Sequence, residues 1–239
     1  MTAPPAVCGV AGAAVVAVVL WDAFETVLVP RRIGRRFRLT NVFYLVTWRG
    51  WRELCRPVRA PSRRETWLGT YAPLSILVLL ACWAAALIAA FALLQYAAGT
   101  GARLAAGHIW RLLYLSGQTF FTLGYGDTTP ASVLGRALSV LEAGMGFGFL
   151  ATVIGYLPTM YTAFSQREVA IALLDARAGS PPTAAEVLRR LPVAQGEASP
   201  DALLGDWERW SAQLLETHIS YPLLAYYRSQ HSKIGRAHV

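Results

Sequence analysis

The chain has 239 residues, of which 55% are hydrophobic and only 15% are charged. A soluble domain carries about 25% charged residues, and here the apolar excess lies in long uncharged runs like those that cross membranes. The three cysteines are far apart and form no CxxC pair, which argues against a disulfide framework or a zinc site. The net charge of +8 is concentrated between residues 31 and 64, a pattern that indicates a cytoplasmic loop rather than a nucleic-acid surface.

The first apolar run, residues 10–29, is long enough for one membrane-spanning helix and forms most of an expected N-terminal unit, residues 1–30. A cluster of arginines follows it directly, so the positive-inside rule places this end of the helix in the cytoplasm and the N-terminus outside. Asp22 and Glu25 lie near the inner end of the run. The pattern favours their pairing with the arginine cluster, and the alternative is a functional role within the membrane.

Residues 31–66 form an expected basic linker on the cytoplasmic side. Within it, residues 40–59 mix apolar and arginine positions in the manner of an amphipathic helix that lies on the inner membrane surface. This linker is a candidate for contact with anionic lipids. The second apolar run, residues 71–98, contains no charged residue and predicts the outer helix of a pore domain that covers residues 67–164.

The apolar segment at residues 108–121 is too short to cross the membrane and predicts a re-entrant helix. It leads into the sequence TLGYGD at residues 122–127, and a third span is predicted over residues 131–164. Together with Thr119, this motif resembles the signature of the potassium-channel pore-loop family. The resemblance covers about residues 71–164.

This resemblance implies an all-α membrane protein with three transmembrane helices, one re-entrant pore helix and one filter per subunit. It is closest in kind to bacterial two-transmembrane-type channels, to which the first span adds an extra N-terminal helix. The resemblance also implies a homotetramer, because one chain supplies one loop and a pore of this kind needs four in closed symmetry.

The resemblance further implies that potassium ions bind to the backbone carbonyls of Thr122, Leu123, Gly124 and Tyr125, with Gly126 completing the ion-binding segment. Rings of carbonyl oxygens replace the water that a potassium ion must shed. Glycine accepts a positive φ without steric cost, which explains the residue type at positions 124 and 126. The Thr122 hydroxyl would complete the innermost ring, and Tyr125 is expected to pack behind the filter.

Four further residues are expected to support the filter: Thr119, Asp127, Tyr114 and Gln118. In the family an aromatic donor on the pore helix anchors the acid at the outer mouth, and Tyr114 occupies that region where many relatives have tryptophan. Gln118 stands where some relatives have glutamate, although an amide still forms hydrogen bonds. Leu123 stands where valine or isoleucine is commoner, and it contributes mainly its carbonyl group.

The third span contains Gly144, Gly146 and Gly148. Glycine in a helix interior costs about 1 kcal/mol relative to alanine, so this cluster indicates a bend or a close contact. Counted from the filter, Gly146 matches the hinge glycine of the family's inner helix, and the alternative is close helix packing through small residues. Pro158 is predicted to kink the same helix near the inner gate.

Two charged residues, Glu142 and Arg136, lie in the outer half of the third span. Charges within a membrane are functional candidates by default. The alternative is a structural pairing behind the filter, for which Arg111 is a candidate partner.

The C-terminal part of the chain, residues 165–232, is polar with a helical pattern and forms an expected cytoplasmic region. The final heptapeptide, Lys233–Val239, matches the in-frame translation of a widely used sequencing adapter. We therefore expect the natural chain to continue beyond about Ser232 and residues 233–239 to have no part in the fold.

These patterns predict a subunit that conducts potassium passively in the inner (plasma) membrane of a bacterium, as a multi-pass protein with a cytoplasmic C-terminus. No nucleophile–base or metal-ligand cluster stands out, so neither an enzyme nor a cofactor beyond the permeant potassium ion is expected. The expected partners are further copies of the chain and membrane lipids, not nucleic acid. The alternatives are a weakly selective cation channel, a potassium transporter subunit, and a signalling membrane protein whose pore is vestigial.

Overall fold

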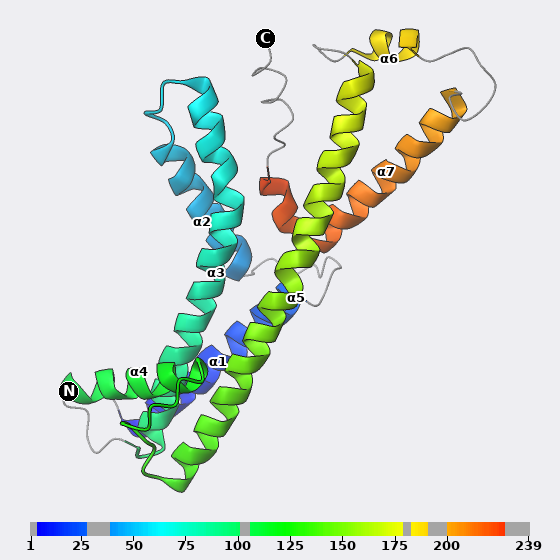
Figure 1. The fold of residues 1–239 in the computed structure, drawn as a ribbon. Helices are drawn as coiled ribbons and strands as arrows, with labels where there is room; N and C mark the ends of the chain where they lie inside the picture. Colours follow the sequence, from blue (N-terminus) through cyan, green and yellow to red (C-terminus); the bar gives the residue numbers. More distant parts are fainter. Residues whose placement is uncertain (1–3, 28–38, 101–105, 179–182, 191–199, 228–239) are drawn as a thin grey trace. The chain divides into compact units, whose positions relative to one another are not determined.

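The computed structural model describes residues 4–27, 39–100, 106–178, 183–190 and 200–227 (Figure 1). All regular elements in these ranges are helices, which confirms the expected all-α class. In chain order they are α1 (Pro5–Val27), α2 (Leu39–Leu54), α3 (Pro61–Ala97), α4 (Ala106–Phe120), α5 (Val133–Ala178), α6 (Ala184–Arg190), α7 (Pro200–Ser220) and the 3₁₀ helix η1 (Pro222–Tyr226).

Three of these helices are long and apolar enough to cross a membrane, as the sequence predicts: α1, the Arg63–Ala97 part of α3, and α5. α4 has 15 residues, which gives a length of about 22 Å at 1.5 Å per residue, less than the ~30 Å hydrocarbon core. The chain is therefore a multi-pass membrane protein with one apolar helix that is too short to span.

The chain divides into two compact units. The first contains residues 1–29, 37–43 and 76–156, and the second contains residues 30–36, 44–75 and 157–239. α2, α3 and α5 each contribute to both units. The first unit holds α4 and the TLGYGD segment, whereas α6, α7 and η1 belong to the second.

Close helix contact explains two glycines of α1 in the first unit. A Cβ at Gly12 would lie 2.7 Å from the carbonyl oxygen of Ala90, and a Cβ at Gly9 would lie 3.1 Å from the Cβ of Ala97. A buried apolar cluster joins α1, α3 and α4: Cys8, Ala92, Tyr96 and Leu112. The N-terminal helix and α4 therefore both pack on the second half of α3.

A buried carboxylate links α1 to α2 and α3. Asp22 accepts hydrogen bonds from the backbone N (3.2 Å) and the hydroxyl (2.7 Å) of Thr40, in the first turn of α2, and from Nε1 of Trp83 (3.1 Å). Several donors make the burial of such a group tolerable. The described partners of Asp22 are thus neutral donors, and the expected pairing with the arginine cluster stays a prediction, because that cluster lies outside the described residues. Glu25 accepts a hydrogen bond from Nε1 of Trp21 at 2.8 Å.

In the second unit, an aromatic cluster joins α2, the first part of α3 and η1. The Tyr71 ring lies 4.9 Å from that of Trp48 and 5.7 Å from that of Tyr226, between ring centroids. Tyr44 stacks on Tyr226 at 5.5 Å. The hydroxyl groups of Tyr71 and Thr47 form a hydrogen bond of 2.8 Å, which fixes the rotation of α2 against α3 at this point.

The C-terminal elements pack on the later turns of α5. Arg167 donates hydrogen bonds to the carbonyl oxygens of Leu224 (3.1 Å), in the middle of η1, and of Tyr227 (2.8 Å), directly after it. A small buried cluster joins the end of α5 to α6 and α7: Ala178, Val187 and Leu203. α5 continues without a break past Phe164, so the expected inner helix and the start of the C-terminal region are one helix.

Candidate functional site

The C-terminal end of α4 sets the direction of the TLGYGD segment. α4 ends at Phe120, and the next three backbone amides remain bonded to carbonyls of its last turns. These hydrogen bonds run from Phe121 to Gly117 (3.0 Å), from Thr122 to Thr119 (3.0 Å) and from Leu123 to Gln118 (2.8 Å). The start of the segment is therefore fixed to the helix by its own backbone.

Every second residue of the segment has a left-handed backbone. The angle φ is 55° at Thr122, 60° at Gly124 and 77° at Gly126, whereas Leu123 and Tyr125 are outside the positive-φ region. An alternation of this kind turns successive peptide groups the same way, so that N–H groups gather on one side and carbonyl oxygens on the other. The backbone is therefore of the kind that can line up a row of carbonyl oxygens.

Thr122 is strained in this arrangement. Among the residues that the structure describes, it alone combines a side chain with a positive φ. A β-branched residue adopts this conformation at a cost on the order of 1–3 kcal/mol, and such strain is typical of functional sites. At Gly124 and Gly126 an added Cβ would meet no atom within 4 Å, so glycine is required there by the φ angle and not by lack of space.

Two side chains of α4 hold the outer end of the segment. The Tyr114 side chain interacts with the Asp127 carboxylate, and Nε2 of Gln118 donates to the carbonyl oxygen of Thr128 at 2.7 Å. The hydroxyl of Thr119 donates to its own helix instead, at the carbonyl oxygen of Leu115 (2.7 Å). Of the four expected support residues, Tyr114 and Gln118 thus bridge helix and segment through side chains, whereas Thr119 does so through its backbone.

The side chains of the segment are largely uncovered in the single chain. Tyr125 is 71% exposed, Phe121 58% and Leu123 55%. The most apolar stretch of α5 is also only 11% buried, against 44% for that of α3. Neighbouring exposed apolar groups mark a surface that another molecule covers. The packing expected behind Tyr125 therefore cannot come from the described residues of the same chain.

Behind the segment, a buried acid joins α5 to α4 and α3. Glu142 and Ser116 are both 0% exposed, and the Ser116 hydroxyl contacts both the Glu142 carboxyl group and the carbonyl oxygen of Ile88 (2.7 Å). The partner of Glu142 is thus a serine and not Arg111, the candidate from the sequence. The pairing was missed because nothing in the sequence indicates that these faces of α4 and α5 meet.

The count of hydrogen-bond donors and acceptors around Ser116 indicates whether Glu142 is protonated or ionised. Serine has one hydroxyl proton, and a carbonyl oxygen or an ionised carboxylate only accepts hydrogen bonds. With an ionised Glu142, two acceptors would therefore compete for the Ser116 proton. Oε2 of Glu142 is also buried without a hydrogen-bond partner among the described residues, which is costly for a charged oxygen. A protonated Glu142 that donates to Ser116 satisfies both contacts.

Gly146, one turn beyond Glu142, packs directly against the end of α4. A Cβ at this position would lie 1.9 Å from the carbonyl oxygen of Phe120. At Gly144 an added Cβ would meet no atom within 4 Å. Close packing therefore accounts for glycine at position 146, while the hinge roles of Gly146, Gly144 and Pro158 stay predictions.

The donor groups of this site are backbone oxygens. In the described part of the chain, no cluster of three or more His, Cys, Asp or Glu side chains could hold a metal ion. Ion binding at the carbonyls of residues 122–125, which carry no net charge, stays a prediction. Such a site suits an ion that binds to neutral oxygens and exchanges rapidly.

Comparison with known proteins gives one match. Residues 74–163 match the family model described as "Ion channel". This range extends from the middle of α3 through α4 and the TLGYGD segment into α5, and it covers less than half of the chain. No match to a curated protein or to a solved structure was found.

Proposed function

Because residues 74–163 match the family model described as "Ion channel", we propose that this chain is one subunit of a homotetrameric, potassium-selective channel. The observation that best supports the proposal is the alternating left-handed backbone at Thr122, Gly124 and Gly126. It gathers carbonyl oxygens on one side of the segment, where they replace the hydration shell of a potassium ion. We assign ion binding to the carbonyls of residues 122–125, with Gly126 completing the segment.

Four copies of the chain would form the pore. One segment supplies oxygens from a single side, whereas an ion without its water needs them from all sides, so closed rotational symmetry is required. The exposed side chains of Leu123 and Tyr125 and the uncovered apolar face of α5 would then be buried between subunits. Within the membrane the assembly would be stabilised by close side-chain packing, because lipid tails are as apolar as the helix faces.

Conduction through such a pore requires no covalent step. The protein needs no resident cofactor, and the potassium ion is its substrate. We place the chain in the inner (plasma) membrane of a bacterium, with the N-terminus outside and the C-terminus in the cytoplasm. This orientation is supported by the arginine cluster that follows the first span.

The test is a flux measurement on the purified chain in lipid vesicles with potassium and sodium on opposite sides. We expect a reversal potential close to that of potassium alone and a loss of flux in Gly124→Ala, because alanine is disfavoured at a φ of 60°. The matched control is Gly50→Ala, a glycine of α2 where an added Cβ also meets no atom within 4 Å.

The outcomes separate the proposal from its rivals. Equal permeability to the two cations would mean a weakly selective channel. An intact tetramer without flux would mean a signalling protein with a vestigial pore. Loss of flux in Gly50→Ala as well would show that the effect of Gly124→Ala does not depend on the segment.

A further inference from the structure

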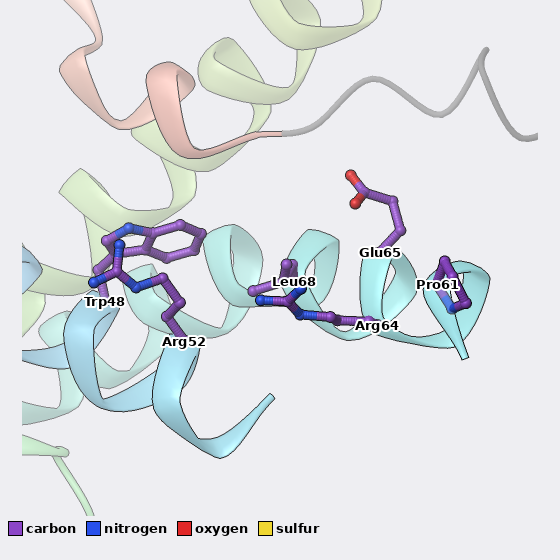
Figure 2. Close-up of a pocket in the computed structure, with 6 residues that line it drawn as sticks. All are labelled: Trp48, Arg52, Pro61, Arg64, Glu65 and Leu68. Carbon is purple, nitrogen blue, oxygen red and sulfur yellow. The ribbon is translucent and has the colours of Figure 1, made fainter. Parts of the chain in front are cut away.

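A basic pocket lies between α2 and the first turns of α3, within the second unit (Figure 2). Its volume is about 290 Å³, and its lining residues are Trp48, Arg52, Pro61, Arg64, Glu65 and Leu68. We propose that this pocket binds the phosphate of an anionic phospholipid headgroup. The proposal goes beyond conduction and depends only on insertion of the chain into a membrane.

Two guanidinium groups without acidic partners give the pocket its charge. Arg52 and Arg64 are exposed, and their side chains form no hydrogen bond or ion pair with the described residues. Figure 2 shows the carboxylate of Glu65 pointing away from both guanidinium groups, and Glu65 takes part in another interaction. Arginine presents its donors in a planar fork that matches the oxygens of a phosphate. With Arg52, Arg64 and Glu65 in its lining, the pocket therefore has an excess of positive charge.

The wall of the pocket is held in place by neighbouring contacts. The Trp48 ring packs edge-on against Tyr71, with 4.9 Å between centroids. Nε1 of Trp51, one turn further along α2, donates to the carbonyl oxygen of Trp67 on α3 at 3.0 Å. Leu68 is 6% exposed and forms the floor. Because α2 and α3 are fixed against each other here, a headgroup would enter a space that exists before it binds.

The position of the pocket along α3 corresponds to the depth of lipid headgroups. The charged residues of α3 end at Arg64 and Glu65, and its uncharged part begins at Thr66, so Arg64 precedes it by about 3 Å at 1.5 Å per residue. Headgroups occupy the layer just outside the hydrocarbon, where tryptophan and arginine are also concentrated. α2 exposes apolar side chains for the acyl chains beside this layer: Val42, Leu45 and Val46. A free phosphate ion would use only the two arginines, whereas a phospholipid would use both features.

The experiment compares two double variants that remove the same charge from the same two helices. R52Q/R64Q removes the guanidinium groups of the pocket. R49Q/R63Q removes two exposed arginines that do not line it. The purified chain is extracted from phosphatidylcholine vesicles that contain a minor fraction of phosphatidylglycerol. The phosphatidylglycerol that stays bound is then counted by native mass spectrometry.

We expect R52Q/R64Q to retain at least about tenfold less phosphatidylglycerol than R49Q/R63Q, because each arginine near a headgroup contributes about 1 kcal/mol. Equal retention in the two double variants would overturn the proposal, since it would reduce the effect to general surface charge. A second arm adds inorganic phosphate to the wild-type chain. Displacement of the lipid by phosphate at millimolar concentration would identify a small-anion site and would also overturn it. Thermal unfolding of each variant verifies that the chain is folded.

Discussion

The TLGYGD segment and the face of α5 behind it keep their shapes by different means. The segment relies on left-handed backbone at Thr122, Gly124 and Gly126, and its side chains are largely exposed. The face behind it relies on contacts of Glu142 and Gly146 with α4, where the side chains are buried. A substitution at the TLGYGD segment should therefore alter conduction, and a substitution on the buried face of α5 should alter stability.

The largest effect on stability is expected for Gly146→Ala. The new Cβ would lie 1.9 Å from the carbonyl oxygen of Phe120, and overpacking against rigid backbone costs about 3 kcal/mol. Thermal unfolding of the purified protein in detergent measures the loss. Gly144→Ala is the matched control, because its Cβ meets nothing within 4 Å and alanine favours the helix by about 1 kcal/mol. An unchanged melting temperature in Gly146→Ala would show that α5 moves away from α4 easily, as a hinge would allow.

A smaller effect on stability is expected for substitutions of Glu142, and its size depends on whether the carboxyl group is protonated. Glu142→Ala removes a buried side chain and its contact with Ser116, at a cost of about 2 kcal/mol. Glu142→Gln keeps a neutral group that donates and accepts, so it should cost less than about 1 kcal/mol. Unfolding at neutral pH measures both, and infrared spectroscopy should show a protonated carboxylic acid that both variants lack. If Glu142→Gln costs as much as Glu142→Ala, the buried acid is ionised.

The smallest change in stability is expected for Tyr114→Phe, at the outer end of the TLGYGD segment. The same variant should clearly alter function. The variant loses the interaction of the phenol hydroxyl with Asp127 and leaves the ring in place. Without this anchor the outer end of the segment is less fixed, so the preference for potassium over sodium should fall while the melting temperature changes little. Tyr161→Phe, at an exposed position on α5, should change neither. A drop in melting temperature as large as that of Gly146→Ala would contradict the distinction between the two regions.

Much of the fold follows from local properties of the chain. The three spans and the short helix α4 are predictable because the length of an apolar run decides whether a helix can cross the hydrocarbon. Glycine at positions 124 and 126 likewise predicts where the backbone can take a positive φ, because this freedom is a property of the glycine residue itself. The positive φ of Thr122 is not predictable in this way, because threonine avoids that conformation when it is free to do so.

The sequence by itself determined which segments are helical and apolar, and where the backbone is able to take a left-handed form. Only the tertiary structure decided the partners of the buried acids. Asp22 accepts a hydrogen bond from Trp83, 61 positions away, and Glu142 contacts Ser116, 26 positions away, where the sequence suggested Arg111. A charged residue indicates that a partner is needed. Which group is that partner depends on the faces with which the helices meet. Those faces are selected by packing along the whole helix, including the close backbone contacts that Gly12 and Gly146 allow because they lack a side chain.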